Sequence, residues 1–373
     1  MLYEKLLPLQ ILIKPDQIMK KLFLSFSLLA SLAFFNACTT DVDLYADYKD
    51  IPVIYSLLNA TADTNYVRIN RAFSGSNDTH INANEVALIA DSCNYPGKLK
   101  AYIVEYKLGY GNQYLPTGDT VELDTMTIRN KEEGIFYSPN QKVYYTDGTT
   151  INNASIFANN NWHSKYKYKL FVFKDNDTIS AETNLVGGED FKIATYSLHF
   201  TSEPTDKSSK IKFSAADNAV FYDLKFVFTY HESINGGPMV DKQVSYSCGS
   251  KSVEELNTEN GMFFFSYNNN VLFNLLRDAI GADTVYDANH PNVERFFDLK
   301  PIQIQLSAGA DELYNYIQVN SQSNFLQTVP DYTNVSGGYG VFSSRIYLTK
   351  EVGLSSMAQT DLYGKESWGF VQH

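Results

Sequence analysis

One cysteine of this chain lies where a defined covalent modification is expected. Lys20 and Lys21 precede an apolar run, Leu22–Phe35, which is soon followed by Ala37 and Cys38. A basic segment, a short apolar segment and a small residue are typical of a secretory signal peptide, and the run is shorter than the roughly 20 residues of a membrane span. The pattern predicts cleavage before Cys38 and lipid on its sulfur. The alternative is an ordinary secretory signal beside an unmodified cysteine.

The other two cysteines are candidates for a disulfide bond. Cys93 and Cys248 would be in an oxidising compartment if the chain is exported. A bond between them would close a long loop and stabilise the fold by about 5 kcal/mol on the chain-entropy argument. Their spacing matches no zinc or redox motif. Two unpaired buried thiols are the alternative.

The remaining reactive side chains do not form a recognisable catalytic or metal-binding pattern. The six histidines are scattered singly, without the spacing of a metal site. Adjacent acids such as Glu132 and Glu133 point to opposite sides of a strand, which is unsuitable for a glycosidase pair. The glycines of Gly337–Gly340 precede a strand-like segment, not a helix, and so predict a tight turn instead of a phosphate loop. The sequence therefore predicts no metal, no cofactor and no enzyme.

Aromatic residues in irregular segments are the predicted ligand contacts. The longest such segments are Ser74–Asn94, Tyr110–Asn130 and Tyr145–Trp162. Loops held by a rigid scaffold are frequent binding sites, and tyrosine and tryptophan offer flat stacking surfaces. Tyr110 and Trp162 are therefore the candidate ligand-binding residues. Burial of the tryptophans in a core is the alternative.

Composition predicts a mainly β protein that does not bind nucleic acid. The chain has 42 acidic residues against 30 Lys and Arg, with a formal net charge of −12. Such a surface repels phosphate backbones. Its 27 tyrosines and 24 phenylalanines favour strands over helices.

Periodicity predicts strands through the first half of the chain. Ile51–Asn59 and Tyr66–Phe73 flank a turn-rich gap and predict a hairpin, and residues 99–110 predict a central strand because both faces are apolar. Further on, Lys165, Lys167 and Lys169 alternate with Tyr166, Tyr168, Leu170 and Val172, which predicts one solvated and one packed face.

The second half alternates strands with two helices. The segment 221–230 places Tyr222, Leu224, Phe226, Phe228 and Tyr230 on one face and predicts a long hairpin through Asn235–Pro238. Apolar residues repeat with helical spacing from Leu272 to Ile280, before Gly281. Residues 310–322 predict a second, shorter helix, and residues 340–348 are expected to close the sheet.

These patterns predict two domains after an anchor. The predicted ranges are 1–37 for an upstream extension and signal peptide with translation starting at Met19, 38–50 for a lipidated tether, 51–189 for an N-terminal β-sandwich, and 190–373 for a C-terminal β-sandwich with short helical insertions.

Three segments carry a resemblance to a family. DLYADYKDIPVIYSLLNATADTNYVRINRAF, LKFVFTYHE, and DELYNYI followed by YTNVSGGYGVFSSR resemble an uncharacterised group of Bacteroidota outer-membrane lipoproteins, often encoded beside TonB-dependent receptors. The resemblance implies an immunoglobulin-like first domain, a fibronectin type III-like second domain and an outer-membrane location. Asp41 and Asp43 resemble the surface-export signal of that group, with a periplasm-facing anchor as the alternative.

Three functions from different classes remain open at this point. The first is a non-catalytic binding protein, lipid-anchored at the outer membrane or cell surface and accessory to an outer-membrane receptor or transport system, with a glycan among its expected partners. The second is a structural or adhesive component of the envelope. The third is a hydrolase with an unrecognised site.

Overall fold

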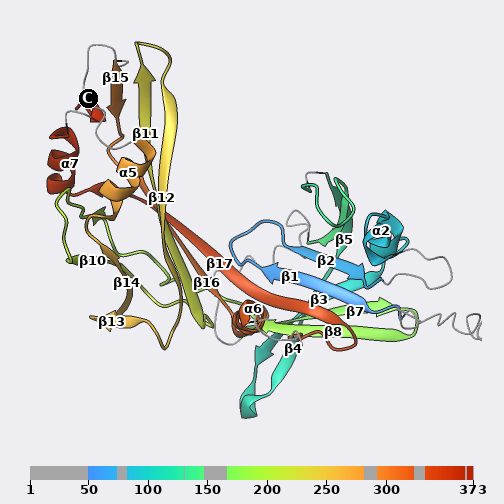
Figure 1. Cartoon of the computed structure of the whole chain (residues 1–373). Helices are drawn as coiled ribbons and strands as arrows, with labels where there is room; N and C mark the ends of the chain where they lie inside the picture. The colour runs from blue at the N-terminus through green and yellow to red at the C-terminus, as the bar shows by residue number, and fades with distance from the viewer. Residues whose placement is uncertain are drawn as a thin grey trace, which may run out of the picture.

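The computed structural model describes residues 49–73, 82–129, 131–146, 166–280, 292–322, 332–365 and 368–372. The protein is mainly β, as its composition predicts, and Figure 1 shows two lobes joined by long strands. Two predicted functional residues, Cys38 and Trp162, lie outside the described residues. No helix in the described ranges is long and apolar enough to cross a membrane.

The first lobe has two sheets around a core that includes Ile54, Ile103 and Leu170. One sheet contains β1 (Pro52–Leu58), β2 (Tyr66–Arg71), β6 (Gln141–Tyr145) and β5 (Asp124–Ile128); the other contains β4 (Tyr114–Glu122), β3 (Lys100–Leu108), β7 (Tyr166–Lys174) and β8 (Asp177–Asn184). Between strands lie α2 (Ala83–Ala87), α3 (Ala90–Cys93) and the short 3-10 helix η2 (Tyr110–Asn112). This arrangement is that of a β-sandwich.

The second lobe is built around a core that includes Phe226, Phe265 and Ile304. Its larger sheet contains β12 (Val240–Ser252), β11 (Phe221–Ile234), β16 (Ile302–Gly309) and β17 (Tyr339–Leu354), with β15 (Val293–Phe296) on β11 and β9 (Ser197–Leu198) on β17; its smaller sheet contains β10 (Ser208–Phe213), β14 (Met262–Asn268) and β13 (Asn257–Glu259). Its helices are α5 (Val271–Ile280) and α7 (Ser356–Tyr363), whereas α6 (Asp311–Gln322) packs on β17 and lies beside β1 and β8 of the first lobe.

Strand β17 belongs to both lobes. Its first part, Tyr339–Ser344, pairs in parallel with β1, and its second part, from Arg345, pairs antiparallel with β16. The two lobes therefore share one ten-stranded sheet, and β17 can be followed from one lobe to the other in Figure 1. The prediction that this segment closes the sheet is wrong: it lies in the middle, between β1 and β16.

The parallel pairing requires a glycine in β17. Gly340 lies opposite Ile54 with a φ of 112°, and a Cβ there would overlap the Ile54 carbonyl oxygen. Only glycine adopts this backbone conformation without strain. The turn predicted at Gly337–Gly340 is confirmed, and it leads directly into this close approach.

The two cores meet in sequence close to the predicted boundary. Leu185 belongs to the first core and Val186 to the second, a few residues before the boundary placed at 189–190. The predicted second range nevertheless includes Val335 and Phe342, which pack in the first core. The immunoglobulin-like and fibronectin-like topologies implied by the resemblance stay predictions.

Most strands with clear alternation are confirmed. The β1–β2 and β11–β12 hairpins form as predicted, and β3 is central in its sheet. All five predicted inward residues of β11 are buried, and in β7 Tyr168, Leu170 and Val172 are buried while Lys167 and Lys169 are half-buried on the opposite face.

Several local predictions need correction. The segment 110–130 contains β4 and β5, and the segment 74–94 contains α2 and α3, so neither is wholly irregular. In α5 the predicted inward residue Ala279 is exposed. The buried residues instead include Val271 and Phe273, at the start of the helix. With 12 residues α6 is longer than α5, which has 10.

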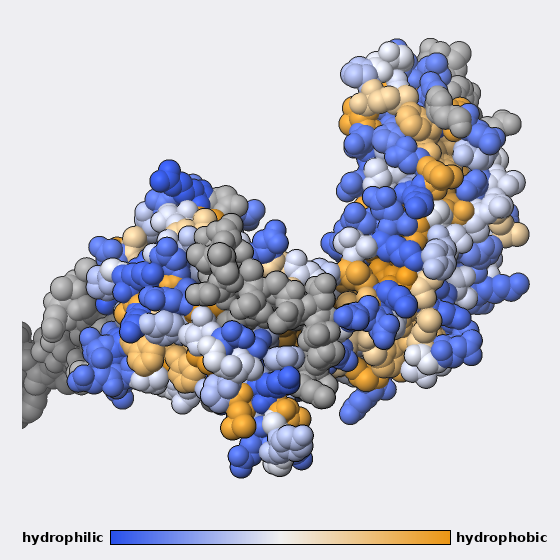
Figure 2. Space-filling view, turned by 180° about the vertical axis from the view of Figure 1, so that it is seen from behind, coloured by the Kyte–Doolittle hydropathy of each residue, from blue (hydrophilic) through white to orange (hydrophobic). Residues whose placement is uncertain are grey.

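The surface mixes hydrophilic and hydrophobic residues. On the face seen in Figure 2, hydrophilic residues cover much of both lobes, and hydrophobic residues form small groups between them. Because folded proteins always expose some apolar surface, such groups need an explanation only where they are hollowed or unusually large.

Candidate functional site

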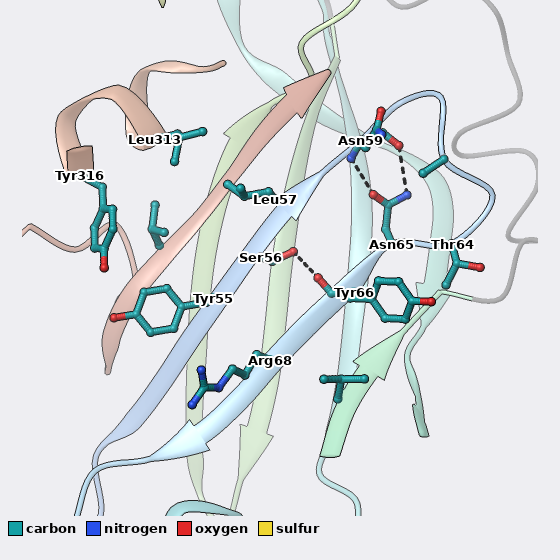
Figure 3. Close-up of a pocket in the computed structure, with 13 residues that line it drawn as sticks. Tyr55, Ser56, Leu57, Asn59, Thr64, Asn65, Tyr66, Arg68, Leu313 and Tyr316 are labelled. Atoms are coloured by element: carbon teal, nitrogen blue, oxygen red, sulfur yellow. Dashed lines mark hydrogen bonds between the residues drawn. The ribbon is translucent and has the colours of Figure 1, made fainter. Parts of the chain in front are cut away.

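A groove lies on the outer face of the shared sheet in the first lobe, with a cavity volume of about 500 Å³. Strand alternation builds its floor, because residues that follow one another point to opposite faces. In β1, Ile54 and Leu58 point into the core, whereas Tyr55 and Leu57 point outward into the groove. Figure 3 shows Tyr55 and Leu57 on the groove side of the sheet.

Helix α6 forms one wall of the groove through Leu313 and Tyr316. The ring of Tyr316 meets that of Tyr55 edge to face, with centroids 6.0 Å apart. This geometry is favourable for two aromatic rings and fixes the distance between wall and floor.

The half-buried carboxylate of Glu312 holds α6 against the sheet. Glu312 accepts hydrogen bonds from Thr183 Oγ1 at 2.8 Å and from Ser343 Oγ at 3.1 Å, and the Leu313 amide donates to Ser343 Oγ at 3.1 Å. Burial raises the pKa of Glu312 above its ordinary value. The helix is thus tied to β8 and β17 beside the groove.

The turn between β1 and β2 closes one end of the groove. Asn65 Oδ1 accepts from the Asn59 amide at 2.6 Å, and Asn65 Nδ2 donates to the Asn59 carbonyl at 3.2 Å. Ser56 Oγ donates to the Tyr66 carbonyl at 2.9 Å. These bonds, dashed in Figure 3, make the turn a rigid end wall, because Ser56 and Asn65 are already bonded to the protein itself.

Arg68 of β2 is the one charged side chain among the described residues that line the groove. Its Nε donates to Asn70 Oδ1. The Asn70 side chain is itself oriented by α3, since its Nδ2 donates to the Cys93 carbonyl at 2.7 Å and to Asn94 Oδ1 at 2.9 Å. Arg68 and Tyr55 are cross-strand partners, so the guanidinium lies beside the aromatic floor.

The lining is suited to binding a ligand. It offers three tyrosines, several aliphatic side chains and one guanidinium; the described residues that line it include no carboxylate, histidine or cysteine. Ligand pockets are typically apolar with a few placed polar groups, as here. Ser56 is buried and donates to the backbone, and the described lining has no histidine or carboxylate to act as its base.

The predicted ligand residues do not lie in this groove. Tyr110 is fully exposed in η2, between β3 and β4, and does not line it. Trp162 is outside the described residues. Trp368, the other tryptophan, is buried and stacks on Phe273 with centroids 6.0 Å apart, which confirms the core alternative for that residue.

The cysteines predicted as a pair are free thiols in the structure. Cys93 is in α3 of the first lobe, and Cys248 is in β12 of the second. Cys248 is the extra residue of a β-bulge, since Leu224 pairs with Gly249 and Lys225 with Ser247. Burial raises the pKa of the Cys248 thiol to about 12 and also raises that of Cys93. The structure thus has the unpaired alternative.

A second depression, of about 250 Å³, lies on the outer face of the second lobe. Gln303 and Gln305 of β16 form its floor, and Asp298, Lys300 and Glu351 contribute opposite charges. This depression is polar where the groove is aromatic. Within the described part of the chain, no group of three or more His, Cys, Asp or Glu side chains could hold a metal ion.

The groove residues had a signal in the sequence that the prediction of loop sites overlooked. In Ile51–Asn59 the outward positions Val53, Tyr55 and Leu57 are as apolar as the inward ones. A half-buried strand normally alternates apolar with polar residues, so an apolar outer face indicates a further contact. The wall contributed by Tyr316 could not be found this way, because it comes from a distant part of the chain.

Comparisons with known proteins add little to this geometry. No family model matches the chain, and no curated protein matches it. Among solved structures, the C-terminal globular domain of an oligosaccharyltransferase from Pyrococcus abyssi is similar over 68% of this chain and 49% of that chain, with 11% identity and a TM-score of 0.19. A likeness at this level carries no argument about function.

Proposed function

We propose that this protein is a non-catalytic binding protein, anchored by lipid, whose ligand occupies the first-lobe groove. The observation that carries the proposal is the groove itself. Tyr55 and Leu57 of β1, Tyr66 and Arg68 of β2, and Tyr316 of α6 converge on one hollow. An outer sheet face needs only polar residues to stay soluble, so aromatic residues around a cavity indicate a contact.

The chemistry of the lining supports binding over catalysis. General acid–base catalysis requires a group that can take or give a proton near neutral pH, and the described residues that line the groove include no carboxylate, histidine or cysteine for that role. Rings held edge to face and a turn closed by the Asn59–Asn65 bonds form a preorganised surface, which lowers the entropic cost of binding.

The anchor in this proposal rests on the sequence. The basic pair, the apolar run and the Ala37–Cys38 junction support acylation of Cys38. The resemblance to Bacteroidota lipoproteins supports an outer-membrane location and a role beside a receptor or transport system. Replacing Cys38 by Ser should move the protein from the membrane to soluble fractions. Continued membrane association of that variant, together with no labelled fatty acid in the wild type, would contradict the anchor.

Loss of ligand on mutation of the groove tests the binding site. The soluble Cys38→Ser protein is screened by ligand-observed NMR against glycan fragments, short peptides and small organic acids. Tyr55→Ala and Tyr316→Ala should each weaken any hit at least about tenfold, since aromatic contacts at binding centres dominate affinity. Tyr110→Ala is the matched control, because that tyrosine is fully exposed and outside the groove. Binding that survives in both groove variants but fails in Tyr110→Ala would transfer the site to the loop.

A further inference from the structure

Among the described residues, Arg68 is the one charged side chain that lines the groove, and no described carboxylate pairs with it. The ion pairs among the described residues involve other side chains, and Arg68 forms none of them. Half-burying a charge beside apolar residues costs free energy unless a partner restores its interactions.

The hydrogen bonds of Arg68 leave one side of its guanidinium available. Nε is used by Asn70, which α3 orients through the Cys93 carbonyl and Asn94. The two terminal nitrogens then remain as a fork for an incoming anion. A planar carboxylate fits that fork with two parallel bonds, which are among the strongest hydrogen bonds in proteins.

The rest of the groove defines what the carboxylate is attached to. Tyr55 is the cross-strand partner of Arg68, and such partners have Cβ atoms about 5 Å apart. Beyond Tyr55 lie Tyr316, Leu313 and Val341. A ligand that reaches Arg68 must therefore place an apolar or aromatic group a few bonds from its charge.

We propose that the groove recognises a carboxylate attached to an apolar body, with Arg68 binding the carboxylate and Tyr55 and Tyr316 contacting the body. This inference rests on the proposed function of the groove. The chain has a net charge of −12, and Arg68 is the one cation among the described residues that line the hollow, so the carboxylate is expected to bind at Arg68. The same chemistry is offered by a free organic acid and by the C-terminus of a peptide that ends in an apolar residue.

The experiment compares two probes that differ only in charge, 4-phenylbutyrate and 4-phenylbutyramide, by NMR titration of the Cys38→Ser protein. The acid should bind at least about tenfold tighter than the amide, since a hydrogen-bonded charge contributes about 1.5–3 kcal/mol. Arg68→Gln should remove this preference, because it should weaken binding of the acid far more than binding of the amide. Arg68→Lys should keep part of it, because lysine retains the charge without the fork.

Two further variants separate positioning from folding. Arg71→Gln is the matched control: Arg71 donates to the Ser92 and Asp91 carbonyls and does not line the groove, so the preference should persist. Asn70→Ala should weaken binding of the acid and leave binding of the amide unchanged, because Asn70 acts by orienting Arg68. A general structural role for Asn70 would weaken both probes alike.

A second arm distinguishes the two sources of carboxylate. The tripeptide Gly-Gly-Phe and its C-terminal amide are titrated in the same way, and the tighter of the two acids identifies the source. Equal binding of acid and amide, with both lost in Tyr316→Ala, overturns the carboxylate proposal but keeps the groove as a binding site. No binding of either acid up to about 10 mM, weaker than any useful affinity, also overturns it, and the screen with the groove variants then decides the proposed function separately.

Discussion

The outer faces of the two lobes belong to one sheet but differ in chemistry. In the second lobe, Gln303 and Gln305 of β16 point outward opposite the buried Ile302, Ile304 and Leu306. This is the alternation that solubility alone requires. In the first lobe, Tyr55 and Leu57 point outward instead. The difference indicates that the first outer face evolved under a demand beyond solubility, which the groove explains.

The first test of this comparison concerns β17, the strand that the two lobes share. Gly340→Val should destabilise the protein by about 3–5 kcal/mol, because the side chain would enter the Ile54 carbonyl and the φ of 112° disfavours it. Chemical denaturation followed by circular dichroism measures the loss. Gly236→Ala is the control: its φ is 70° with nothing within 4 Å of the added Cβ, so its cost should be only about 1 kcal/mol.

If Gly340→Val is no worse than the control, the parallel pairing of β1 with β17 is wrong. The groove would then lose the strand that carries Val341, and the ten-stranded sheet would separate into two. The comparison of two faces of one sheet would no longer hold.

Two adjacent leucines of β1 sharpen the comparison next. Leu58 is fully buried, whereas Leu57 is 37% exposed on the groove side. Leu58→Ala should cost about 3 kcal/mol, as a buried leucine does on truncation. Leu57→Ala should stay within about 0.5 kcal/mol, the range of surface substitutions. Urea midpoints measure both, and a comparable loss for both would mean that the outer face is packed core and not a binding surface.

The sequence predicts well where one face of a strand is buried and the other solvated. The alternation of Tyr222, Leu224 and Phe226 revealed β11 because period two is unmistakable when every inward residue is buried. β4 was missed because almost all of its side chains are exposed, Val121 apart, and alternation disappears when neither face is packed. Edge strands of this kind leave little trace in composition.

The groove could be predicted only in part. Its floor follows from β1, where the apolar outward residues Tyr55 and Leu57 are visible in the sequence. The rest of the lining comes from the far end of the chain, since α6 contributes Tyr316 and β17 contributes Val341. Contacts such as the hydrogen bond from Ser344 Oγ to the Leu58 carbonyl hold β17 beside β1. No local pattern encodes a contact across such a separation, so the hollow appears only in the folded chain.

The half-buried carboxylate of Glu312 beside the groove predicts a pH effect in the first lobe. Since burial raises the pKa of Glu312 above 4.5, the folded state binds this proton more tightly than the unfolded state. Its contribution to stability is therefore present below about pH 4.5 and lost as the pH rises through the folded pKa. Glu312→Gln should stabilise the protein by about 1 kcal/mol at neutral pH and have little effect at pH 4.

Urea denaturation at several pH values checks this difference. Gln can still accept one of the hydrogen bonds from Thr183 and Ser343, so the fold should be kept. A loss of stability in Glu312→Gln at every pH would show that the ionised carboxylate, and not its neutral form, holds α6 on the sheet.

The smallest effect on stability is expected in the second lobe. There the pKa of a histidine is raised, like that of Glu312, but the cause is the neighbouring carboxylates and not burial. His231 lies between Asp241, 2.8 Å from Nδ1, and Asp298, 3.5 Å from Nε2, and these carboxylates raise its pKa above 6.5. Its stabilisation is fully present below about pH 6.5 and lost as the pH rises through the folded pKa. Both aspartates are well exposed, so the gain in stability is at most about 0.5 kcal/mol.

Titration of the His231 ring by NMR measures the shift of its pKa. Asp241→Asn should reduce this shift more than Asp298→Asn, because the hydrogen bond from His231 to Asp241 is the shorter one. An unshifted ring in the wild type would mean that the pair does not persist in solution. In that case His231 would add no pH dependence to the stability of the second lobe.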